Sequence, residues 1–412
     1  MTDRIILLFL VAFLAACHPA NEVSNQPQLP LKPGTWRMNL TVDDTFIPIR
    51  FEVDSALTIT WVNSDERIPV TDISLLGDSL FFSMPRFNSD FSGTLLNDSR
   101  FTGMWNNKAR QDYQIPFEAF YVSSEPASNT LNTEPEHYEV WFSPGTDDEY
   151  KAVGLFQYEG SEVHGTFLTE TGDYRYLQGT HANDQLLLSC FDGSHLFGFT
   201  GTMRGDSIVN GEFRSGKHWK EPWVAVRNSQ YQLTHPDSLT HVVHEDQPLE
   251  FHVLTMSGDP MVINPDLLKG KVTIIQIFGS WCPNCYDENV FYKELSDAYS
   301  TRGLQIIPVA FEKSDDFTVN AMSIEKQFAE IGINYPPYLG GKASKSEASA
   351  KFPMLDEVIS FPTSLFIDKD GTIRKVHTGF YGPGTGTYYE TYCRDTRRFI
   401  EMLLAEAPLA SI

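Results

Sequence analysis

The sequence predicts a multi-domain protein in which an all-β region, folded as a sandwich or a barrel, precedes a C-terminal α/β domain. The chain has 412 residues, more than one hydrophobic core usually organises. Residues 34–230 contain short runs of alternating hydrophobicity separated by turn residues, which is typical of strands. From residue 251 onward, β-rich runs alternate with segments of helical periodicity, which indicates an α/β fold.

Composition and charge exclude two classes of partner. Apolar residues make up 41% of the chain and charged residues 21%, values typical of a globular protein. The formal net charge is −23. Nucleic acids and anionic membrane surfaces bind cationic surfaces, so neither is expected as a partner.

The N-terminus has the features of an export signal. Arg4 is followed by an unbroken apolar run at residues 5–16. As a helix this run would be about 18 Å long, too short for a bilayer core of about 30 Å, so residues 1–16 are predicted to be a signal peptide. The run ends in Leu-Ala-Ala-Cys at Cys17, which resembles the lipobox of bacterial lipoproteins and implies cleavage before Cys17 and lipidation of its thiol. An ordinary signal peptide, cut after Ala16, is the alternative.

Residues 17–33 are predicted to be the lipidated cysteine and a tether. Residues 18–33 are polar and rich in Pro, Asn and Gln, and such a segment buries too little apolar surface to fold. As a random coil it would span about 20–25 Å. The lipobox resemblance implies an extracytoplasmic protein on the periplasmic face, lipid-anchored to the membrane, with the outer membrane of a Gram-negative bacterium as the expected location. Disulfides persist in such a compartment.

One pattern within the all-β region occurs twice. Residues 93–105 and residues 201–213 share the pattern G-T-x-x-x-D-S-x-x-x-G-x-aromatic, at an offset of 108 residues. Each copy describes a strand, a tight turn containing Asp, and a second strand, which together form a β-hairpin. Two related halves in a duplicated sandwich or barrel would explain the pattern, and independent reuse of the same turn chemistry is the alternative.

Residues 231–250 are predicted to link the two regions. They contain three histidines and two prolines among few aliphatic residues. His241 and His244 would share one face of a helix, but no cysteine or carboxylate cluster stands at metal-binding spacing. A solvated linker is therefore expected, and no metal site is predicted.

Residues 251–412 are predicted to form the α/β domain. The expected strands are residues 272–278 and 304–311 and a hairpin at residues 363–368 and 372–377. The expected helices are residues 284–299, a helix capped by Asp315 or Asp316, and residues 387–405. This order predicts a mixed sheet packed against helices.

Trp281, Cys282, Pro283, Asn284 and Cys285 stand between a predicted strand and a predicted helix. Cys282 would lie at the helix N-terminus, where free N–H groups and the positive end of the helix dipole stabilise a thiolate. The thiolate is the species that attacks a disulfide. Cys285, one turn into the helix, can then attack the mixed disulfide and release the partner. Pro283 suits the first turn, because its missing N–H would have no bonding partner there.

Three other roles for the cysteine pair are weaker. A structural disulfide across so short a loop removes little entropy from the unfolded chain. A zinc site needs a second pair of ligands at suitable spacing, which the sequence lacks. A peroxidatic cysteine does not require the second cysteine. Redox exchange is the favoured interpretation for Cys282 and Cys285.

With these motifs, residues 246–405 resemble the thioredoxin superfamily, and most of all its TlpA/ResA-like branch of anchored extracytoplasmic thiol–disulfide reductases. Residues 281–285 match the family's W-C-x-x-C motif, and Phe361, Pro362 and Thr363 match its cis-proline loop. The resemblance implies a thioredoxin fold for residues 251–412. It also implies that the backbone beside Pro362 pairs with an extended substrate segment and that Phe361 tunes selectivity.

Glu288 follows Cys285 by three residues, where this branch often has a glutamate. The resemblance implies that Glu288 tunes the pKa values of the cysteines, and a solvated glutamate that favours the helix dipole is the alternative. The sequence departs from the branch at Asn289 and Val290, where an apolar residue and proline are common. A helix without the usual kink is therefore expected.

The other residues considered have structural interpretations. Cys190, at the end of an apolar strand, and Cys393, on the last helix, are expected to be buried unreactive thiols. His377, on the hairpin, is expected to be structural. Residues 34–230 show no paired-carboxylate or Ser/His/Asp site, so a binding or positioning role is assigned to them by elimination.

The sequence thus predicts a thiol–disulfide oxidoreductase that needs no cofactor. The resemblance implies that it reduces oxidised client proteins outside the cytoplasm, with apocytochrome c and cytochrome c maturation as the family-level substrate and pathway, and that an upstream thiol protein supplies the electrons. A disulfide oxidase or isomerase on the same fold is one alternative, because the dipeptide between the cysteines does not settle the redox poise. A surface binding lipoprotein, with the β-region as its main functional part, is the other.

Overall fold

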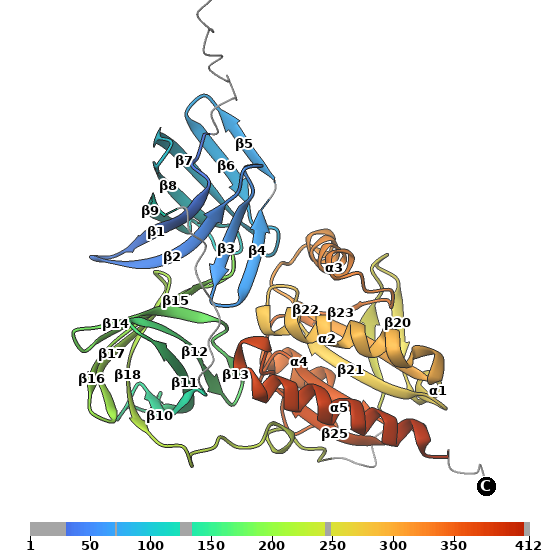
Figure 1. The fold of residues 1–412 in the computed structure, drawn as a ribbon. Helices are drawn as coiled ribbons and strands as arrows, with labels where there is room; N and C mark the ends of the chain where they lie inside the picture. The colour runs from blue at the N-terminus through green and yellow to red at the C-terminus, as the bar shows by residue number, and fades with distance from the viewer. Residues whose placement is uncertain (1–29, 71, 124–133, 244–248, 408–412) are drawn as a thin grey trace, which may run out of the picture.

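The computed structural model describes residues 30–70, 72–123, 134–243 and 249–407. The predicted signal peptide, Cys17, most of the tether and His244 lie outside the described residues. The described chain forms two antiparallel β-barrels and a C-terminal α/β domain, which Figure 1 shows in blue, in green, and in yellow to red. The predicted all-β region followed by an α/β domain is confirmed. Within the described ranges, no helix has both the length and the apolar character to cross a membrane.

The first barrel is a nine-stranded sheet in which the first strand pairs with the last. Its order is β4-β3-β2-β1-β9-β8-β7-β6-β5. The strands are β1 (Gly34–Val42), β2 (Thr45–Val53), β3 (Ile59–Asn63), β4 (Glu66–Val70), β5 (Ile73–Leu76), β6 (Ser79–Ser83), β7 (Ser89–Asn97), β8 (Arg100–Asn107) and β9 (Gln114–Ser123). Alternate side chains point inward, so Trp36, Trp61 and Trp105 are buried in one aromatic core.

The second barrel is also a nine-stranded sheet, and it closes on itself because β11 pairs with β12. Its order is β11-β10-β18-β17-β16-β15-β14-β12-β13. The strands are β10 (Glu136–Phe142), β11 (Tyr150–Glu159), β12 (Glu162–Thr169), β13 (Gly172–Asp173), β14 (Leu177–Ala182), β15 (Gln185–Phe191), β16 (Leu196–Arg204), β17 (Ser207–Ser215) and β18 (Trp219–Arg227). Phe142, Phe167, Phe199 and Trp223 fill its interior.

The repeated sequence pattern occupies the same position in both barrels. Residues 93–105 lie in the β7–β8 hairpin, which turns at residues 98–99, and residues 201–213 lie in the β16–β17 hairpin, which turns at residues 205–206. In each barrel this hairpin precedes the last strand, and the last strand pairs with the first. The predicted hairpins are confirmed, and the two barrels share the arrangement that a duplication would produce.

The C-terminal domain has a seven-stranded mixed sheet in the order β20-β19-β23-β22-β21-β24-β25. The strands are β19 (Phe251–Leu254), β20 (Pro260–Ile263), β21 (Val272–Phe278), β22 (Leu304–Glu312), β23 (Tyr338–Lys342), β24 (Thr363–Ile367) and β25 (Ile373–Thr378). The helices are α1 (Pro265–Leu268), α2 (Pro283–Tyr299), α3 (Phe317–Ile331), α4 (Lys345–Lys351) and α5 (Thr387–Ala405). Strand β21 is buried along its whole length, because α2 and α5 pack on one face of the sheet and α4 on the other.

The connector before the α/β domain departs from the expected solvated linker. Thr240 is 2% exposed, and its Oγ1 accepts a hydrogen bond from Thr378 Oγ1 at 2.7 Å. Asp237 contacts His377 Nδ1 at 2.6 Å. These connector residues therefore contact the α/β domain through partners distant in sequence, while most residues of the segment 231–243 are exposed or half-buried. His377 has the structural position expected of it.

Arg175 of the second barrel is a buried cation where the three domains meet. Its side chain is 4% exposed. The guanidinium contacts Glu66 of the first barrel at 2.7 Å, Asp287 of α2 at 2.6 Å and Asp192 of its own barrel at 3.3 Å. Buried charges are costly unless they are paired, so these four side chains depend on one another. Arg175 thereby links both barrels to the helix that carries the cysteine pair.

Replacing Arg175 with methionine should destabilise the protein, because it leaves buried carboxylates without their cation. We expect the free energy of unfolding to fall by about 3–5 kcal/mol in denaturant titrations. The control is Arg50→Met, which removes a partly exposed ion pair to Glu162 at 3.3 Å and should cost less than about 1 kcal/mol. Equal losses in the two variants would contradict this role of Arg175.

Candidate active site

The cysteine pair lies where β21 ends and α2 begins. Cys282 is the N-cap residue of α2, with extended backbone, and Cys285 lies one turn into the helix. The two residues form a disulfide, with their Cα atoms 5.2 Å apart. The backbone N–H of Cys285 points at Cys282 Sγ across 3.2 Å. After reduction, this N–H and the helix dipole would stabilise a thiolate on Cys282.

The loop at Phe361 and Pro362 packs beside Cys282. The peptide bond between these two residues is cis. The carbonyl oxygen of Phe361 lies 3.6 Å from Cys282 Sγ. The rings of Phe361 and Trp281 meet edge to face, with centroids 5.7 Å apart. Two motifs that are far apart in the sequence therefore form one site.

Glu288 lies beneath this site, enclosed by protein. It is fully buried, one turn beyond Cys285. Its carboxylate accepts hydrogen bonds from Gln276 Nε2 at 2.8 Å and from the hydroxyls of Ser364 and Tyr392 at 3.3 Å. Burial raises the pKa of Glu288 to about 7. The alternative of a solvated glutamate is wrong, because β21, β24 and α5 cover this face of α2.

Glu312, at the end of β22, holds the turn that leads into the cysteine motif. Its carboxylate accepts hydrogen bonds from the backbone N–H of Ser280 at 2.7 Å and from the Ser280 hydroxyl at 2.9 Å. Glu312 is 4% exposed, and burial raises its pKa to about 7. Sequence reasoning missed Glu312. The available signal was a carboxylate at the end of an otherwise apolar strand.

Trp281 is fixed between this turn and the cis-proline loop. Its indole N–H donates a hydrogen bond to the carbonyl oxygen of Phe311 at 2.9 Å. The ammonium group of Lys313 lies 4.2 Å from the centre of the Trp281 ring. A cation at this distance is attracted to the face of an aromatic ring. The end of β22 and Phe361 therefore both determine the orientation of the Trp281 ring.

Cys282 opens into a cleft between the α/β domain and the second barrel. The residue is 6% exposed. The cleft has a volume of about 720 Å³, with Trp281, Cys282 and Phe361 on one wall and Tyr150 and Tyr174 of the second barrel on the other. A disulfide has to enter this cleft to meet the sulfur of Cys282.

One turn of the second barrel, residues 169–173, lies directly against the cysteine motif. Ser360, next to the cis-proline loop, donates a hydrogen bond from its hydroxyl to the carbonyl oxygen of Thr171 at 2.9 Å. Gly172 has a φ of 146°, a conformation that favours glycine, and a Cβ added there would lie 2.3 Å from Asn284 Nδ2. The second barrel thus narrows access to Cys282. The sequence of residues 169–173 predicts a turn but does not indicate that this turn lies beside the cysteine motif.

The remaining residues considered from the sequence lie away from the cleft. Asn289 is buried and donates a hydrogen bond to Gln327 of α3 at 3.3 Å, and α2 continues without interruption past it. Cys190 is buried in the second barrel, where burial raises the pKa of its thiol. Cys393 is only partly buried, and burial raises the pKa of its thiol to about 11. Across the described parts of the chain, no group of three possible metal ligands occurs.

Residues 244–389 match the model of the Redoxin family. Among curated proteins, the chain is similar to the thiol-disulfide oxidoreductase ResA of Geobacillus thermodenitrificans, with 25% identity over 111 residues that cover 27% of this chain and 56% of the relative. It is also similar to the sporulation thiol-disulfide oxidoreductase A of Bacillus subtilis, with 26% identity over 132 residues that cover 32% of this chain and 72% of the relative. The chain spans about half the length of the ResA relatives from Geobacillus thermodenitrificans and Bacillus thuringiensis.

Solved structures resemble part of the chain. A putative thiol:disulfide interchange protein DsbE from Chlorobium tepidum has 20% identity and a TM-score of 0.30, and the match covers 38% of this chain and 94% of that one. StoA from Bacillus subtilis has 24% identity and a TM-score of 0.26, and the match covers 36% of this chain and 96% of that one. The Redoxin match contains Cys282, Cys285, Glu288 and Pro362 and leaves both barrels outside it.

Glu288→Gln should change how the stability of the protein depends on pH. The pKa of Glu288 in the folded protein is raised from 4.5 to about 7, so the stability that its protonated carboxyl contributes is full below pH 4.5 and is lost as the pH rises through about 7. Glutamine does not titrate. As the pH rises from 4.5 to above 7, the free energy of unfolding of the variant should therefore increase relative to that of the parent by up to about 3 kcal/mol.

Denaturant titrations at several pH values measure this difference. The control is Glu294→Gln on the same helix, whose side chain is 52% exposed and pairs with Arg397 at 2.7 Å. Because this side chain is not enclosed by protein, the variant should lack the gain of up to about 3 kcal/mol that is expected for Glu288→Gln. A constant difference for Glu288→Gln would show that the pKa of Glu288 is the same in the folded and the unfolded protein, against the enclosed position described above.

Proposed function

We propose that this chain, in which residues 244–389 form a Redoxin-family domain of thioredoxin fold, is a thiol–disulfide reductase that acts on exported proteins. The observation that carries the proposal is the setting of Cys282. It caps α2, its partner Cys285 lies one turn deeper, and the carbonyl oxygen of Phe361 lies 3.6 Å from its sulfur. A cysteine at a helix N-terminus, with a second cysteine in reach, is suited to disulfide exchange.

Two exchange steps would move the electrons from the cysteine pair to the client. The Cys282 thiolate attacks one sulfur of the client disulfide, that S–S bond breaks, and the departing thiolate takes a proton from water. Cys285 then loses its proton and attacks Cys282 Sγ, so the mixed disulfide breaks and the client leaves with two thiols. The cysteine pair ends as a disulfide, oxidised by two electrons, and an upstream thiol donor reduces it again.

Exposure supports Cys282 as the attacking residue. Cys282 is 6% exposed and lines the cleft, whereas Cys285 is fully buried. The disulfide exchange reaction needs the sulfur atoms in line, so the client has to approach the sulfur that faces the cleft. Cys285 needs only to reach Cys282, with which it already forms a disulfide.

Two buried acids support reduction over oxidation. Glu288 and Glu312 lie near the motif with pKa values raised to about 7, so each carries negative charge for part of the time at neutral pH. A nearby negative charge disfavours a thiolate on Cys282. A less stabilised thiolate makes the reduced pair a better electron donor, because strong oxidants stabilise their reduced form.

The remaining parts of the proposal concern location and clients. Lipidation of Cys17 would anchor the chain at the periplasmic face of a membrane, and the Leu-Ala-Ala-Cys ending of the apolar run supports this. The outer membrane of a Gram-negative bacterium is the proposed site. Oxidised exported proteins are the proposed clients, with apocytochrome c as the candidate that the ResA-like resemblance suggests.

Cys285→Ser should trap client proteins as mixed disulfides, because the second exchange step is lost, and Cys282→Ser should trap none. Non-reducing gels of cell extracts, followed by identification of the captured proteins, measure both variants. Cys190→Ser serves as the control and should behave as the parent does. Trapping by Cys282→Ser would show that Cys285 is the attacking residue.

The midpoint potential of the cysteine pair should lie toward that of thioredoxin, near about −270 mV, and away from strong oxidants near about −120 mV. Equilibration with glutathione buffers and counting of free thiols gives this value. A midpoint above about −180 mV, in the range of disulfide isomerases, would reverse the proposed direction of electron flow and favour the oxidase or isomerase alternative.

The mature N-terminus should be a diacylglyceryl-modified Cys17, which mass spectrometry of the protein purified from membranes can identify. Cys17→Ala should release the protein from the membrane fraction, while Cys393→Ala should leave it there. A mature protein that begins at Cys17 without lipid would contradict the anchor and support an ordinary signal peptide.

A further inference from the structure

The cleft that holds Cys282 continues into a second cleft. The second cleft has a volume of about 630 Å³ and lies between the barrels and the α/β domain. Trp281 lines both clefts. On the opposite wall, Gly193 and Ser194 line the second cleft, and the next residue, His195, lines the first. The two clefts therefore run between the same two segments and meet beside the redox site.

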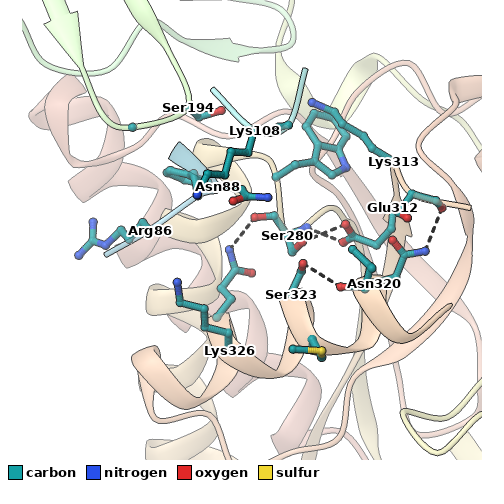
Figure 2. Close-up of a pocket in the computed structure, with 18 of the residues that line it drawn as sticks. Arg86, Asn88, Lys108, Ser194, Ser280, Glu312, Lys313, Asn320, Ser323 and Lys326 are labelled. Carbon is teal, nitrogen blue, oxygen red and sulfur yellow. Dashed lines mark hydrogen bonds between the residues drawn. The ribbon is translucent and has the colours of Figure 1, made fainter. Parts of the chain in front are cut away.

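The second cleft, here called the cationic cleft, is lined by four basic side chains, Arg86, Lys108, Lys313 and Lys326, and two acidic ones, Glu312 and Glu330. Figure 2 shows Arg86 and Lys108 on segments of the first barrel, and Lys313 and Lys326 on the α/β domain. The lining therefore has two more basic than acidic side chains, in a chain whose formal net charge is −23. Such a local excess of positive charge marks a surface for an anionic ligand.

The four cations are not equally available. Arg86 pairs with Glu330 at 2.9 Å, and Lys108 pairs with Asp90 outside the lining. Lys313 and Lys326 form no ion pair with any carboxylate in the described part of the chain. Lys313 instead lies over the ring of Trp281, the residue shared by the two clefts. The unpaired positive charge is therefore next to the cysteine motif.

We propose that the cationic cleft binds an acidic stretch of the client polypeptide, beside the client cysteine that reacts with Cys282. This inference rests on the proposed reductase function and names its substrate class. An extended chain whose cysteine enters the first cleft has to pass Trp281, and its neighbouring residues then lie between Lys313 and Lys326. Aspartate or glutamate side chains there would pair with the two free ammonium groups.

An extended polypeptide suits these clefts better than a small anion does. The two clefts together form a trough past Cys282 with walls from all three domains. A small anionic disulfide would occupy the first cleft alone and leave Lys326, on α3, without contact. The magnitude expected is modest: an exposed ion pair changes an affinity by about two- to fivefold, and two pairs together by about tenfold. Such pairs weaken with salt.

The test uses the full mature chain, reduced in advance, in single-turnover reactions with short synthetic peptides. Each peptide carries one cysteine as a mixed disulfide with uncharged 2-mercaptoethanol and has glutamate, glutamine or lysine residues next to it. Cys282 attacks the peptide sulfur and 2-mercaptoethanol leaves as a thiol. Cys285 then releases the peptide thiol, and the enzyme ends as its disulfide. The measured quantity is the ratio of second-order rate constants between peptides, which cancels any general change in reactivity.

The parent should react about five- to tenfold faster with the acidic peptide than with the neutral one at low salt, and the ratio should fall as salt is added. Lys313→Gln combined with Lys326→Gln should bring the ratio close to one. Lys313→Glu combined with Lys326→Glu should reverse the preference, so that the lysine peptide reacts faster than the acidic peptide. The control is Lys345→Glu on α4, which is exposed and outside the clefts, and it should keep the ratio of the parent.

Two results would overturn the inference while leaving the reductase intact. One is a parent ratio near one, and the other is a ratio that survives the double glutamine substitution. A preference for oxidised glutathione over hydroxyethyl disulfide, without a preference for acidic peptides, would show that the basic side chains bind a small anionic disulfide. That result would overturn the proposal that the cationic cleft binds an acidic polypeptide. Failure of the parent to reduce any of these disulfides would overturn the proposed function and this inference together.

Discussion

The buried guanidinium of Arg175 determines which surfaces of the three domains face one another. Glu66 and Asp287 reach it from the first barrel and from α2, at 2.7 Å and 2.6 Å, and Asp192 completes the group from the second barrel. A charge in this position has no solvent to replace a lost partner, so the barrels cannot turn away from α2 without leaving charges unpaired. Because Asp287 follows Cys285 by two residues, the same contact keeps the barrels over the redox site.

A redox site with controlled access follows from that constraint. The barrels carry no cysteine pair, yet the second barrel narrows the approach to Cys282 with the turn at residues 169–173, and the first barrel adds Arg86 and Lys108 to the neighbouring cleft. The α/β domain supplies the chemistry and the barrels supply the walls. The contribution of residues 34–230 that the structure shows is therefore geometric: they form walls of the two clefts beside the cysteine pair.

The acids around α2 share one physical cause. Burial raises the pKa of Glu288 and of Glu312 to about 7 and that of Asp287 to about 6. Glu288 is enclosed by β21, β24 and α5, Asp287 lies against Arg175 of the second barrel, and Glu312 lies at the end of β22 beside the turn that leads into α2. These carboxyls therefore gain or lose their negative charge near neutral pH. The electrostatic environment of Cys282 changes with pH as a result, even though the disulfide itself carries no charge.

The sequence by itself determined the fold class, the order of the domains, the two repeated hairpins and the cysteine motif before α2, because each depends on local periodicity, turn chemistry or spacing. It also pointed to Glu288, but the choice between a solvated and an enclosed carboxyl depended on β24 and α5, which meet α2 only after folding. Glu312, the partners of the connector and the two clefts depend on contacts between residues tens or hundreds of positions apart, such as Arg175 with Asp287. Only the tertiary structure decided these, since burial and charge pairing are properties of neighbours in space, and local patterns along a chain do not encode which neighbours those are.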